Sequence, residues 1–285
     1  MTVMLKLLRQ ARAAFSMLSA DEVRERADKP IHVGLVADSS GAYAELEDFL
    51  VPGYLGHSER LQRLAQVHRA SDSEPPSRVD LVLYEPGLAC PKGAYTYYRG
   101  YPEQTVAEIL SEKKDLGAAL ARQFPPFRSV VVESIIHEVS RENTIFAVAT
   151  SLPNVVPSFI ELPWAFGEFA SDTAFLTANQ MRMAFQIAAA CGKDVGMAQQ
   201  KFELLGIAGG AFGWRALARE LVGHIPFGGG LIPKGAIAYA GTYLAGKGLE
   251  RLHLENGRHT SEELKSLYEH GLHRGRQVVR QIRAS

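Results

Sequence analysis

The sequence has few cysteines, no excess of charge of either sign and no long uncharged apolar run. Cys90 and Cys191 are the two cysteines of the 285 residues, and their separation excludes a CxxC metal or redox motif. We therefore expect two free, buried thiols in a reducing cytoplasm. Lys+Arg and Asp+Glu both number 31, so no global field attracts nucleic acid. We expect no nucleic-acid partner.

Membrane signals are also weak. Lys6, Arg9 and Arg12 interrupt the apolar residues near the N-terminus, so no secretory signal is expected. No uncharged apolar run of 18 residues occurs, which argues against a simple transmembrane helix. Residues 1–29 are predicted to form N-terminal amphipathic helices, the second opening at a capping box, Ser19–Glu22. The basic first helix either packs on its own domain or lies on an anionic membrane. The predicted location is cytoplasmic, with peripheral binding at the inner membrane left open.

Residues 30–123 have the pattern of a small α/β domain with a mostly parallel sheet. Short apolar runs alternate with helix-like segments in the order that parallel strands require. Strands are expected at 31–37 and 78–84, and helices at 42–50, 58–68 and 102–123. The tyrosine-rich segment 93–101 is either a contact surface or a loop folded onto its own domain.

The turn after the first expected strand is where a nucleotide-binding domain would carry its phosphate-binding residues. A P-loop has the pattern GxxxxGK[ST], in which glycines, lysine and hydroxyl contact phosphates and Mg²⁺. Ala37 and Ala42 stand at the glycine positions, Tyr43 at the lysine and Ala44 at the hydroxyl residue. Tyr84 stands where a GTPase would carry an Mg²⁺-binding aspartate. The segment is therefore either a degenerate P-loop-like domain without phosphate chemistry or an ordinary βα unit.

No catalytic residue, cofactor site or metal site is expected anywhere in the chain. His137 and Glu138 begin an HExxH zinc motif, but its second histidine position holds Arg141. The glycines between 206 and 213, assisted by Arg215 or Arg219, leave open an unconventional phosphate site at a helix N-terminus. The sequence thus favours a protein without enzymatic activity.

Residues 124–285 are predicted to form an all-α domain. Helices are expected at 128–141, 181–191, 194–205, 208–224, from 234, and 260–282, while 144–150 is either a strand or a continued helix. Capping residues are expected at Thr177, Asp194 and Thr260, and Asn256-Gly257 is expected to end the helix that starts near 234. The aromatic segment 152–169 is either a partner or membrane surface or a cover for the core.

The stretch 206–248 dominates this domain, because it holds twelve of the 26 glycines. Two apolar helices flanking the turn 226–233 predict a glycine-rich helical hairpin. A stripe of small residues on the second helix permits close helix approach; it comprises Ala238, Gly241, Ala245 and Gly248. Tyr239 and Tyr243 are expected to stack one turn apart. The expected partner or membrane contacts are Trp214, Arg215, Arg219, Phe227 and Lys234.

Several separated motifs resemble one family. They lie at residues 176–183, 188–192, 209–221 and 233–242. Together with the run starting at Phe124, they resemble a bacterial helical domain of unknown function, family 697, with an apparent aromatic-rich insertion at 155–175. Such domains often accompany Era-like or dynamin-like GTPase domains. The resemblance implies GTPase-like neighbours and, in some members, membranes, and it brings no established activity.

We therefore predict a non-catalytic interaction protein or scaffold that acts through the hairpin 206–248. The partner is a membrane surface, a GTPase-like or other protein, or a second copy of the chain. The alternative is a GTPase-like or other nucleotide-binding switch with an unconventional site.

Overall fold

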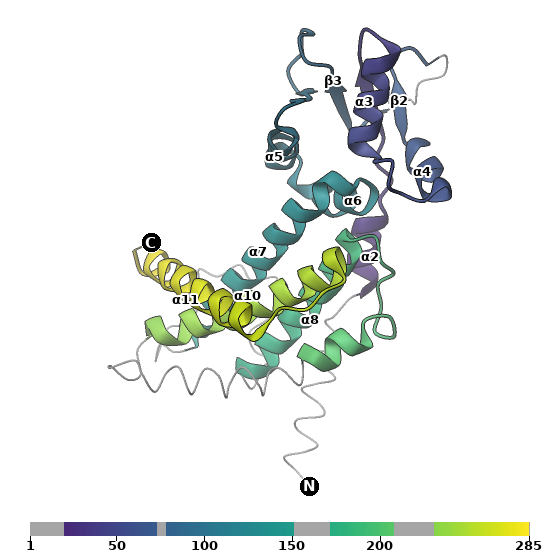
Figure 1. Cartoon of the computed structure of the whole chain (residues 1–285). Coiled ribbons are helices and arrows are strands. Elements are labelled where there is room, and N and C mark those ends of the chain that lie inside the picture. The colour runs from purple at the N-terminus through teal and green to yellow at the C-terminus, as the bar shows by residue number, and fades with distance from the viewer. Residues whose placement is uncertain (1–19, 73–77, 151–171, 208–230, 285) are drawn as a thin grey trace. The chain divides into compact units, whose positions relative to one another are not determined.

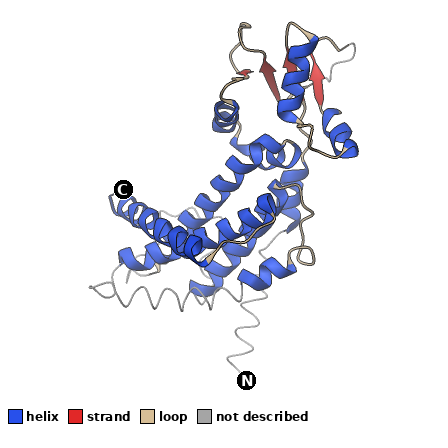
Figure 2. Cartoon of the chain, in the orientation of Figure 1, coloured by secondary structure: helices blue, strands red, loops and turns tan. Residues whose placement is uncertain are grey.

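The structure is a computed structural model, and it describes residues 20–72, 78–150, 172–207 and 231–284. These residues are mostly helical, with one small four-stranded parallel sheet near the N-terminus (Figure 2). The chain divides into two compact units. We call residues 22–132 and 189–193 the α/β unit, and residues 1–21, 133–188 and 194–285 the helical unit. The predicted combination of an α/β part and a helical part is confirmed at this level.

The sheet of the α/β unit has the strand order β2-β1-β3-β4, and every pair is parallel. The two longer strands, β1 (Val33–Val36) and β3 (Leu81–Tyr84), lie within the segments predicted to be strands. Along each of them buried and partly buried residues alternate. Helix α3 (Ser40–Leu50) follows β1 and contacts it, burying Leu46 and Leu50. The apolar positions of the sequence were sufficient to place these three elements.

Two strands escaped prediction because they are very short. β2 (Val67–Arg69) pairs with β1, and it follows α4 (His57–Leu64) where a single helix to residue 68 was expected. β4 (Tyr95–Thr96) pairs with β3 inside the tyrosine-rich segment. Tyr95 is only 1% exposed, so this part of the segment folds onto its own unit. Two or three residues show no periodicity, and pairing with a neighbouring strand supplies the order.

The helix predicted over 102–123 is interrupted. The segment forms α5 (Pro102–Glu112), the 3₁₀ turn η1 (Lys114–Leu116) and α6 (Gly117–Gln123), followed by η2 (Pro125–Phe127). The break allows Ile109 and Leu120 both to be completely buried. The position of the break depends on how the side chains pack after it. Helix propensity describes single residues and does not contain this information.

Long helices make up the described part of the helical unit (Figure 1). They are α7 (Arg128–Ala149), α8 (Asp172–Ala190), α10 (Leu231–Glu255) and α11 (Ser261–Ala284), with further helical residues at 201–207. Helix α2 (Ala20–Asp28), most of which belongs to the α/β unit, starts within the predicted capping segment 19–22. Residues 144–150 continue α7 up to Ala149, so the helical alternative is correct. Phe146, Ala147 and Val148 are all buried, which explains why no one-sided pattern was visible.

The predicted helix-end signals were correct at Thr260 and Asn256 and wrong at Thr177 and Asp194. Thr260 and Glu263 form a reciprocal capping box at the start of α11, since each side chain bonds the other's backbone N–H at 3.3 and 2.7 Å. Asn256 follows the end of α10 with a φ of 50°. Thr177, however, lies inside α8 rather than at its start, so that predicted cap is wrong. Asp194 is also not a cap, because the following helix begins at residue 201.

Helices α10 and α11 pack through small residues. A Cβ atom added to Gly271 would lie 2.9 Å from the Cα of Ala240, and one added to Gly275 would lie 2.8 Å from the Cα of Ala236. Neither Ala236 nor Ala240 belongs to the predicted stripe, of which Ala238 and Gly241 are buried. Its last member, Gly248, makes no close approach, because a Cβ added there would meet nothing within 4 Å.

Some sequence predictions fall outside the described residues. These are the first helix, the aromatic segment 152–169, the helix at 208–224 and most of the turn 226–233. Cys191 is buried as expected, but Cys90 is exposed, which corrects that prediction; neither cysteine is in a disulfide. Among the described helices, none is long and apolar enough to cross a membrane.

Candidate functional site

The predicted contact residues are placed only in part. Trp214, Arg215, Arg219 and Phe227 lie outside the described residues. Lys234 lies in the first turn of α10, where it is exposed and its Nζ is 3.4 Å from the Thr150 hydroxyl at the end of α7. The described residues therefore do not test the hairpin as a contact surface.

The turn between β1 and α3 is where a P-loop would hold phosphate. The Ser39 hydroxyl accepts the backbone N–H of Ala42 at 3.1 Å and caps α3. The backbone N–H of Asp38 donates to the Glu85 carboxylate at 2.9 Å. Because Asp38 and Glu85 follow the neighbouring strands β1 and β3, two acidic residues stand at the carboxyl edge of the sheet. This arrangement repels a phosphate rather than binding it.

The residue at the lysine position of the P-loop pattern is part of the core. Tyr43 is 8% exposed, and the guanidinium of Arg69 lies 5.3 Å from the centre of its ring. Arg69 is held by a two-pronged hydrogen bond to Glu47, with distances of 2.7 and 2.9 Å. The side chains around this turn are therefore engaged with one another.

A cluster of titratable residues joins α7 and α10 in the helical unit. His137 Nδ1 lies 2.6 Å from the Tyr239 hydroxyl, and His137 Nε2 lies 2.7 Å from the Glu133 carboxylate. The carboxylate can only accept, so Nε2 carries the proton and Tyr239 donates to Nδ1. The other oxygen of Glu133 bonds Lys247 at 2.8 Å, and Lys247 also pairs with Glu250. We call Glu133, His137, Tyr239 and Lys247 the relay cluster.

These contacts shift the pKa values of the cluster in opposite directions. The hydrogen bond from His137, followed by that from Lys247, lowers the pKa of Glu133 to about 2 despite partial burial. Burial lowers the pKa of Lys247, but the hydrogen bonds to Glu133 and Glu250 outweigh it and raise the pKa overall. Burial raises the pKa of Tyr239 to about 12. At neutral pH the cluster therefore holds one carboxylate–ammonium pair and a protonated phenol.

Aromatic rings and a second cation surround the relay cluster. The ring of Tyr243 stacks on His137 and on Tyr239, with centroids 5.6 and 6.2 Å apart, so the predicted stacking of the two tyrosines is confirmed. His270 of α11 lies on another side of Tyr243, at 5.7 Å. Arg274 Nη1 lies 3.4 Å from His137 Nε2. The rings cover one side of the imidazole, while the side chains of His137 and Glu133 stay partly exposed.

The order hydroxyl, imidazole and carboxylate is that of a general-base relay. Here, however, the hydroxyl belongs to Tyr239, which is 2% exposed and whose pKa is raised. A buried phenol of raised pKa neither reaches a substrate nor ionises readily. We interpret the relay cluster as a link between helices. In the sequence, the relay cluster is visible only as two i,i+4 pairs, Glu133 with His137 and Tyr239 with Tyr243. The contact between these two pairs, which lie on different helices, was not predicted.

A second buried cluster joins α7, α8 and α10 through amide and hydroxyl side chains, with one ion pair beside them. Asn143 donates to the Thr242 hydroxyl at 2.7 Å, and Gln180 donates to the same oxygen at 3.2 Å. Asn179 donates to Asn143 and to Glu142, both at 2.9 Å, and Glu142 also pairs with Arg182. The sequence predicts Asn179 and Gln180 as part of a helix cap; instead they connect three helices in the core.

Helix α11 has an exposed basic face. From His270 to its end the helix contains no aspartate or glutamate. His273, Arg276 and Arg280 are exposed and make no ion pair within the described residues. On the opposite side, Tyr268 and Val279 are 1% and 0% exposed. The arginines are visible in the sequence, but interaction with the helix dipole was sufficient to explain them there.

Comparisons of the chain with protein-family models, with characterised proteins and with solved structures find no match. Within residues 20–72, 78–150, 172–207 and 231–284, no group of three or more His, Cys, Asp or Glu side chains is placed to hold a metal ion. The resemblance to family 697 therefore stays a prediction.

Proposed function

We propose that the chain is a non-catalytic interaction protein that binds an anionic membrane surface peripherally through its helical unit. The observation that carries this proposal is the cationic row of α11, formed by His273, Arg276 and Arg280, which has no acidic partner among the described residues. Cations on one face of a helix attract acidic lipid headgroups at about 1 kcal/mol per Lys or Arg. The total charge of the chain is zero, so this attraction is a local property of α11.

The row is presented outward by the packing of α11 on α10. Gly271 and Gly275 allow close contact along one side of α11, and Val279 continues that side. His273, Arg276 and Arg280 follow the spacing i, i+3, i+7, which places them together on a different side. Lys234, the described member of the predicted hairpin contacts, is an exposed cation in the same unit.

Vesicle co-sedimentation tests the proposal. We expect the chain to pellet with vesicles of phosphatidylcholine and phosphatidylserine and to stay in the supernatant with phosphatidylcholine alone. Arg276→Gln combined with Arg280→Gln removes two cations, which should weaken binding by about 2 kcal/mol, roughly 30-fold. The matched control is Arg78→Gln with Lys92→Gln, two exposed cations of the α/β unit. Equal loss in both double variants, or no pelleting of the unmodified chain, contradicts the proposal.

Two further variants test the contacts predicted from sequence. Phe227→Asp should abolish membrane or partner binding while leaving the unfolding transition unchanged. If Phe227→Asp instead unfolds the chain, the turn belongs to the core and its surface role is wrong. Removing residues 1–18 shows whether the basic first helix contributes affinity. A protein partner is distinguished from a membrane in the same assay, because the chain would bind a protein partner without vesicles.

A second candidate is a degenerate GTPase-like domain that responds to nucleotide. The order β2-β1-β3-β4 favours it, because the connection from β1 runs to β2 on one side and the connection from β3 runs to β4 on the other, and such a switch point commonly lies beside a ligand crevice. Asp38 and Glu85 argue against phosphate at that position. A ligand at about 1 mM with micromolar affinity would stabilise the chain by roughly 4 kcal/mol. Thermal unfolding with GTP, ATP and NAD tests this candidate. If none of the three nucleotides raises the melting temperature, the candidate is eliminated.

A further inference from the structure

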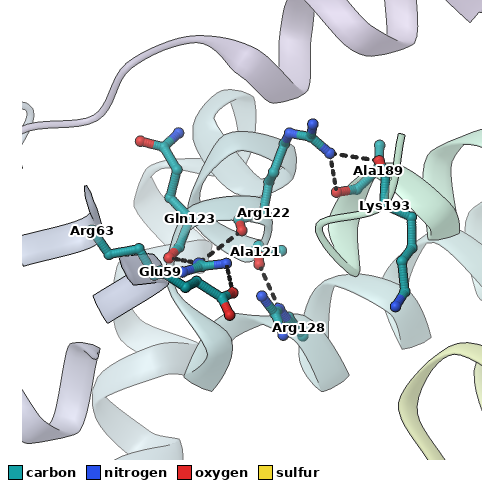
Figure 3. A network of polar contacts seen from close by, with 8 residues as sticks. All are labelled: Glu59, Arg63, Ala121, Arg122, Gln123, Arg128, Ala189 and Lys193. Atoms are coloured by element: carbon teal, nitrogen blue, oxygen red, sulfur yellow. Dashed lines mark hydrogen bonds and ion pairs between the residues drawn. The ribbon is translucent and has the colours of Figure 1, made fainter. Parts of the chain in front are cut away.

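Arginine side chains occupy the carboxyl end of α6 in the α/β unit (Figure 3). Arg63 Nη1 donates to the carbonyl of Arg122 at 3.0 Å and also to that of Gln123. Arg128 Nε donates to the carbonyl of Ala121 at 3.2 Å. The last carbonyls of a helix attract cations, so these bonds explain the arginines as a helix cap. A second group of basic side chains lies on the sheet of the same unit, away from any such helix end.

One face of this sheet is covered by α3, and the other is partly exposed. Arg69 of β2 stands opposite Leu35 of β1 and bonds Glu47 of α3, so α3 lies on the face of Leu35. The other face, which we call the open face, carries partly exposed residues of three strands: Gly34, Val36, His68, Val82 and Tyr84. The described parts of the connections from β2 to β3 and from β3 to β4 contain no helix that would cover it. Parallel sheets usually have both faces covered, whereas water reaches this open face.

Two histidines meet on the open face. His32 lies two residues before Gly34, and so on the same face as His68. His32 Nδ1 lies 3.0 Å from His68 Nε2, and the centres of the two rings are 5.2 Å apart. Two imidazole nitrogens bound at about 2.0–2.1 Å to one metal ion lie about 2.9 Å apart at a right angle and about 3.3 Å apart at a tetrahedral angle. The observed separation falls between these values, although a hydrogen bond between the two rings would have the same length.

The surroundings keep the two imidazoles in place and favour a cation. Burial, followed by the charge of His32, lowers the pKa of His68 against the opposing effect of Asp72. A metal ion binds neutral imidazole, and a lowered pKa favours that form of His68 at neutral pH. The backbone of His32 is held by Asp80, whose carboxylate accepts its N–H at 2.9 Å and whose N–H donates to its carbonyl at 2.8 Å. The charges of Asp72 and Asp80 also attract a cation to this part of the sheet.

Gln66 provides an oxygen donor at the same place in the sheet. It stands opposite His32, one position before the paired residues Val33 and Val67. Its Oε1 is buried and has no hydrogen-bond partner among the described residues. A buried acceptor without a donor is costly, and a bound cation removes that cost. With two histidines and one amide, this group differs from the clusters of three His, Cys, Asp or Glu side chains that the described residues lack.

We propose that His32 and His68 bind one divalent transition-metal ion of the Zn²⁺ class on the open face, with the Gln66 amide oxygen and water as further ligands. Imidazole is a preferred ligand of such ions, and a site that solvent reaches keeps water in the positions that the protein leaves. This inference goes beyond the membrane proposal, because it concerns the α/β unit and involves no residue of α11.

Calorimetric titration of the full chain with zinc chloride tests the site. We expect saturable binding of one Zn²⁺ per chain. His32→Gln and His68→Gln should each weaken Zn²⁺ binding by at least about tenfold, because losing a direct ligand costs at least as much as losing the partner that orients a ligand. Gln66→Leu should weaken it by a smaller factor, since both imidazoles remain. His57→Gln, at an exposed histidine of α4, is the matched control and should bind Zn²⁺ as the unmodified chain does.

The proposal is overturned if the unmodified chain takes up no Zn²⁺, because the two histidines then share only a hydrogen bond. It is also overturned if the histidine variants bind Zn²⁺ as tightly as the unmodified chain does. Unchanged binding in Gln66→Leu removes the amide oxygen from the assigned ligands. Should one histidine variant fail to fold, the other decides. None of these variants changes α11, so vesicle binding should stay the same and the membrane proposal is tested separately.

Discussion

Single residues in this chain act mainly by joining helices through polar contacts. Glu133 receives hydrogen bonds from both His137 and Lys247, on α7 and α10. Thr242 accepts from Asn143 and Gln180, on α7 and α8. Buried polar groups that are fully paired specify one arrangement of helices, whereas removing one partner leaves the others unpaired.

Glu133 provides a pH-dependent prediction. Its pKa is lowered to about 2 from an ordinary value of 4.5, so the folded state favours the ionised carboxylate more than the unfolded state does. The stabilisation is present above about pH 4.5 and is lost as the pH falls towards 2. Glu133→Gln should lower the free energy of unfolding by roughly 1 kcal/mol at pH 7, a modest value because the side chain is 38% exposed. Urea unfolding at pH 7 and pH 3 measures the difference, and an equal loss at both pH values would refute the assignment.

Thr242→Val tests the buried amide cluster. The substitution keeps the shape but removes the oxygen that accepts from Asn143 and Gln180, so it should cost about 2–3 kcal/mol in unfolding free energy. Thr150→Val is the matched control, because Thr150 is exposed just after α7, where its hydroxyl bonds the carbonyl of Phe146 at 3.0 Å and lies 3.4 Å from the exposed Lys234 Nζ. It should change stability by less than about 0.5 kcal/mol. Comparable losses of unfolding free energy in the two variants would show that the amide cluster does not contribute more to stability than an exposed hydroxyl.

At the scale of elements, the contact between α10 and α11 depends on glycine. The Cβ positions of Gly271 and Gly275 meet backbone atoms of α10, and backbone atoms cannot move aside as a flexible side chain can. The helices must separate to admit even a methyl group. The same contact orients α11 and so exposes its basic face, which links this packing to the proposed function.

Gly275→Ala should therefore destabilise the chain by about 1–3 kcal/mol through overpacking. Gly248→Ala, in the same type of helical backbone, meets nothing within 4 Å. That control should stabilise by roughly 0.5–1 kcal/mol, because alanine favours the helix. Denaturant unfolding of both variants gives opposite signs if the glycine contact is correct, and a stabilising Gly275→Ala would be incompatible with it.

At the scale of the whole molecule, charge is balanced overall and separated locally. The equal numbers of acidic and basic residues give no net field, while the second half of α11 has basic residues and no acidic ones. The proposed attraction to a membrane is therefore assigned to a local basic face and not to the total charge. The α/β unit has the opposite tendency at its sheet edge, where Asp38 and Glu85 meet.

Membrane binding should accordingly depend on salt. Raising the ionic strength from about 0.1 M to 1 M shortens the screening length from about 10 Å to 3 Å. We expect pelleting with anionic vesicles to be largely lost over this range. Pelleting that persists at high salt would indicate apolar insertion, and the basic face would not be the main contact.

Features set by neighbouring residues could be predicted from the sequence. The capping box at Thr260 and Glu263, the helix end at Asn256 and the stacking of Tyr239 on Tyr243 each involve residues within four positions. Their geometry follows from backbone dihedral angles and local hydrogen bonds, which the sequence specifies directly. The strands β1 and β3 were also visible, because their apolar runs are long enough to recognise.

Features that join distant residues required the tertiary structure. His137 and Tyr239 are 102 positions apart, and Asp38 and Glu85 are 47 apart, so no local pattern pairs them. The prediction of Thr177 as a helix cap was wrong for the same reason. The local pattern suits a cap, but α8 begins before Thr177, at Asp172, and Asn179 and Gln180 lie in the core. Helix ends such as Thr260 and Asn256 thus follow from local chemistry. The clusters and their burial follow from which helices pack together, because only packing excludes water from both partners at once.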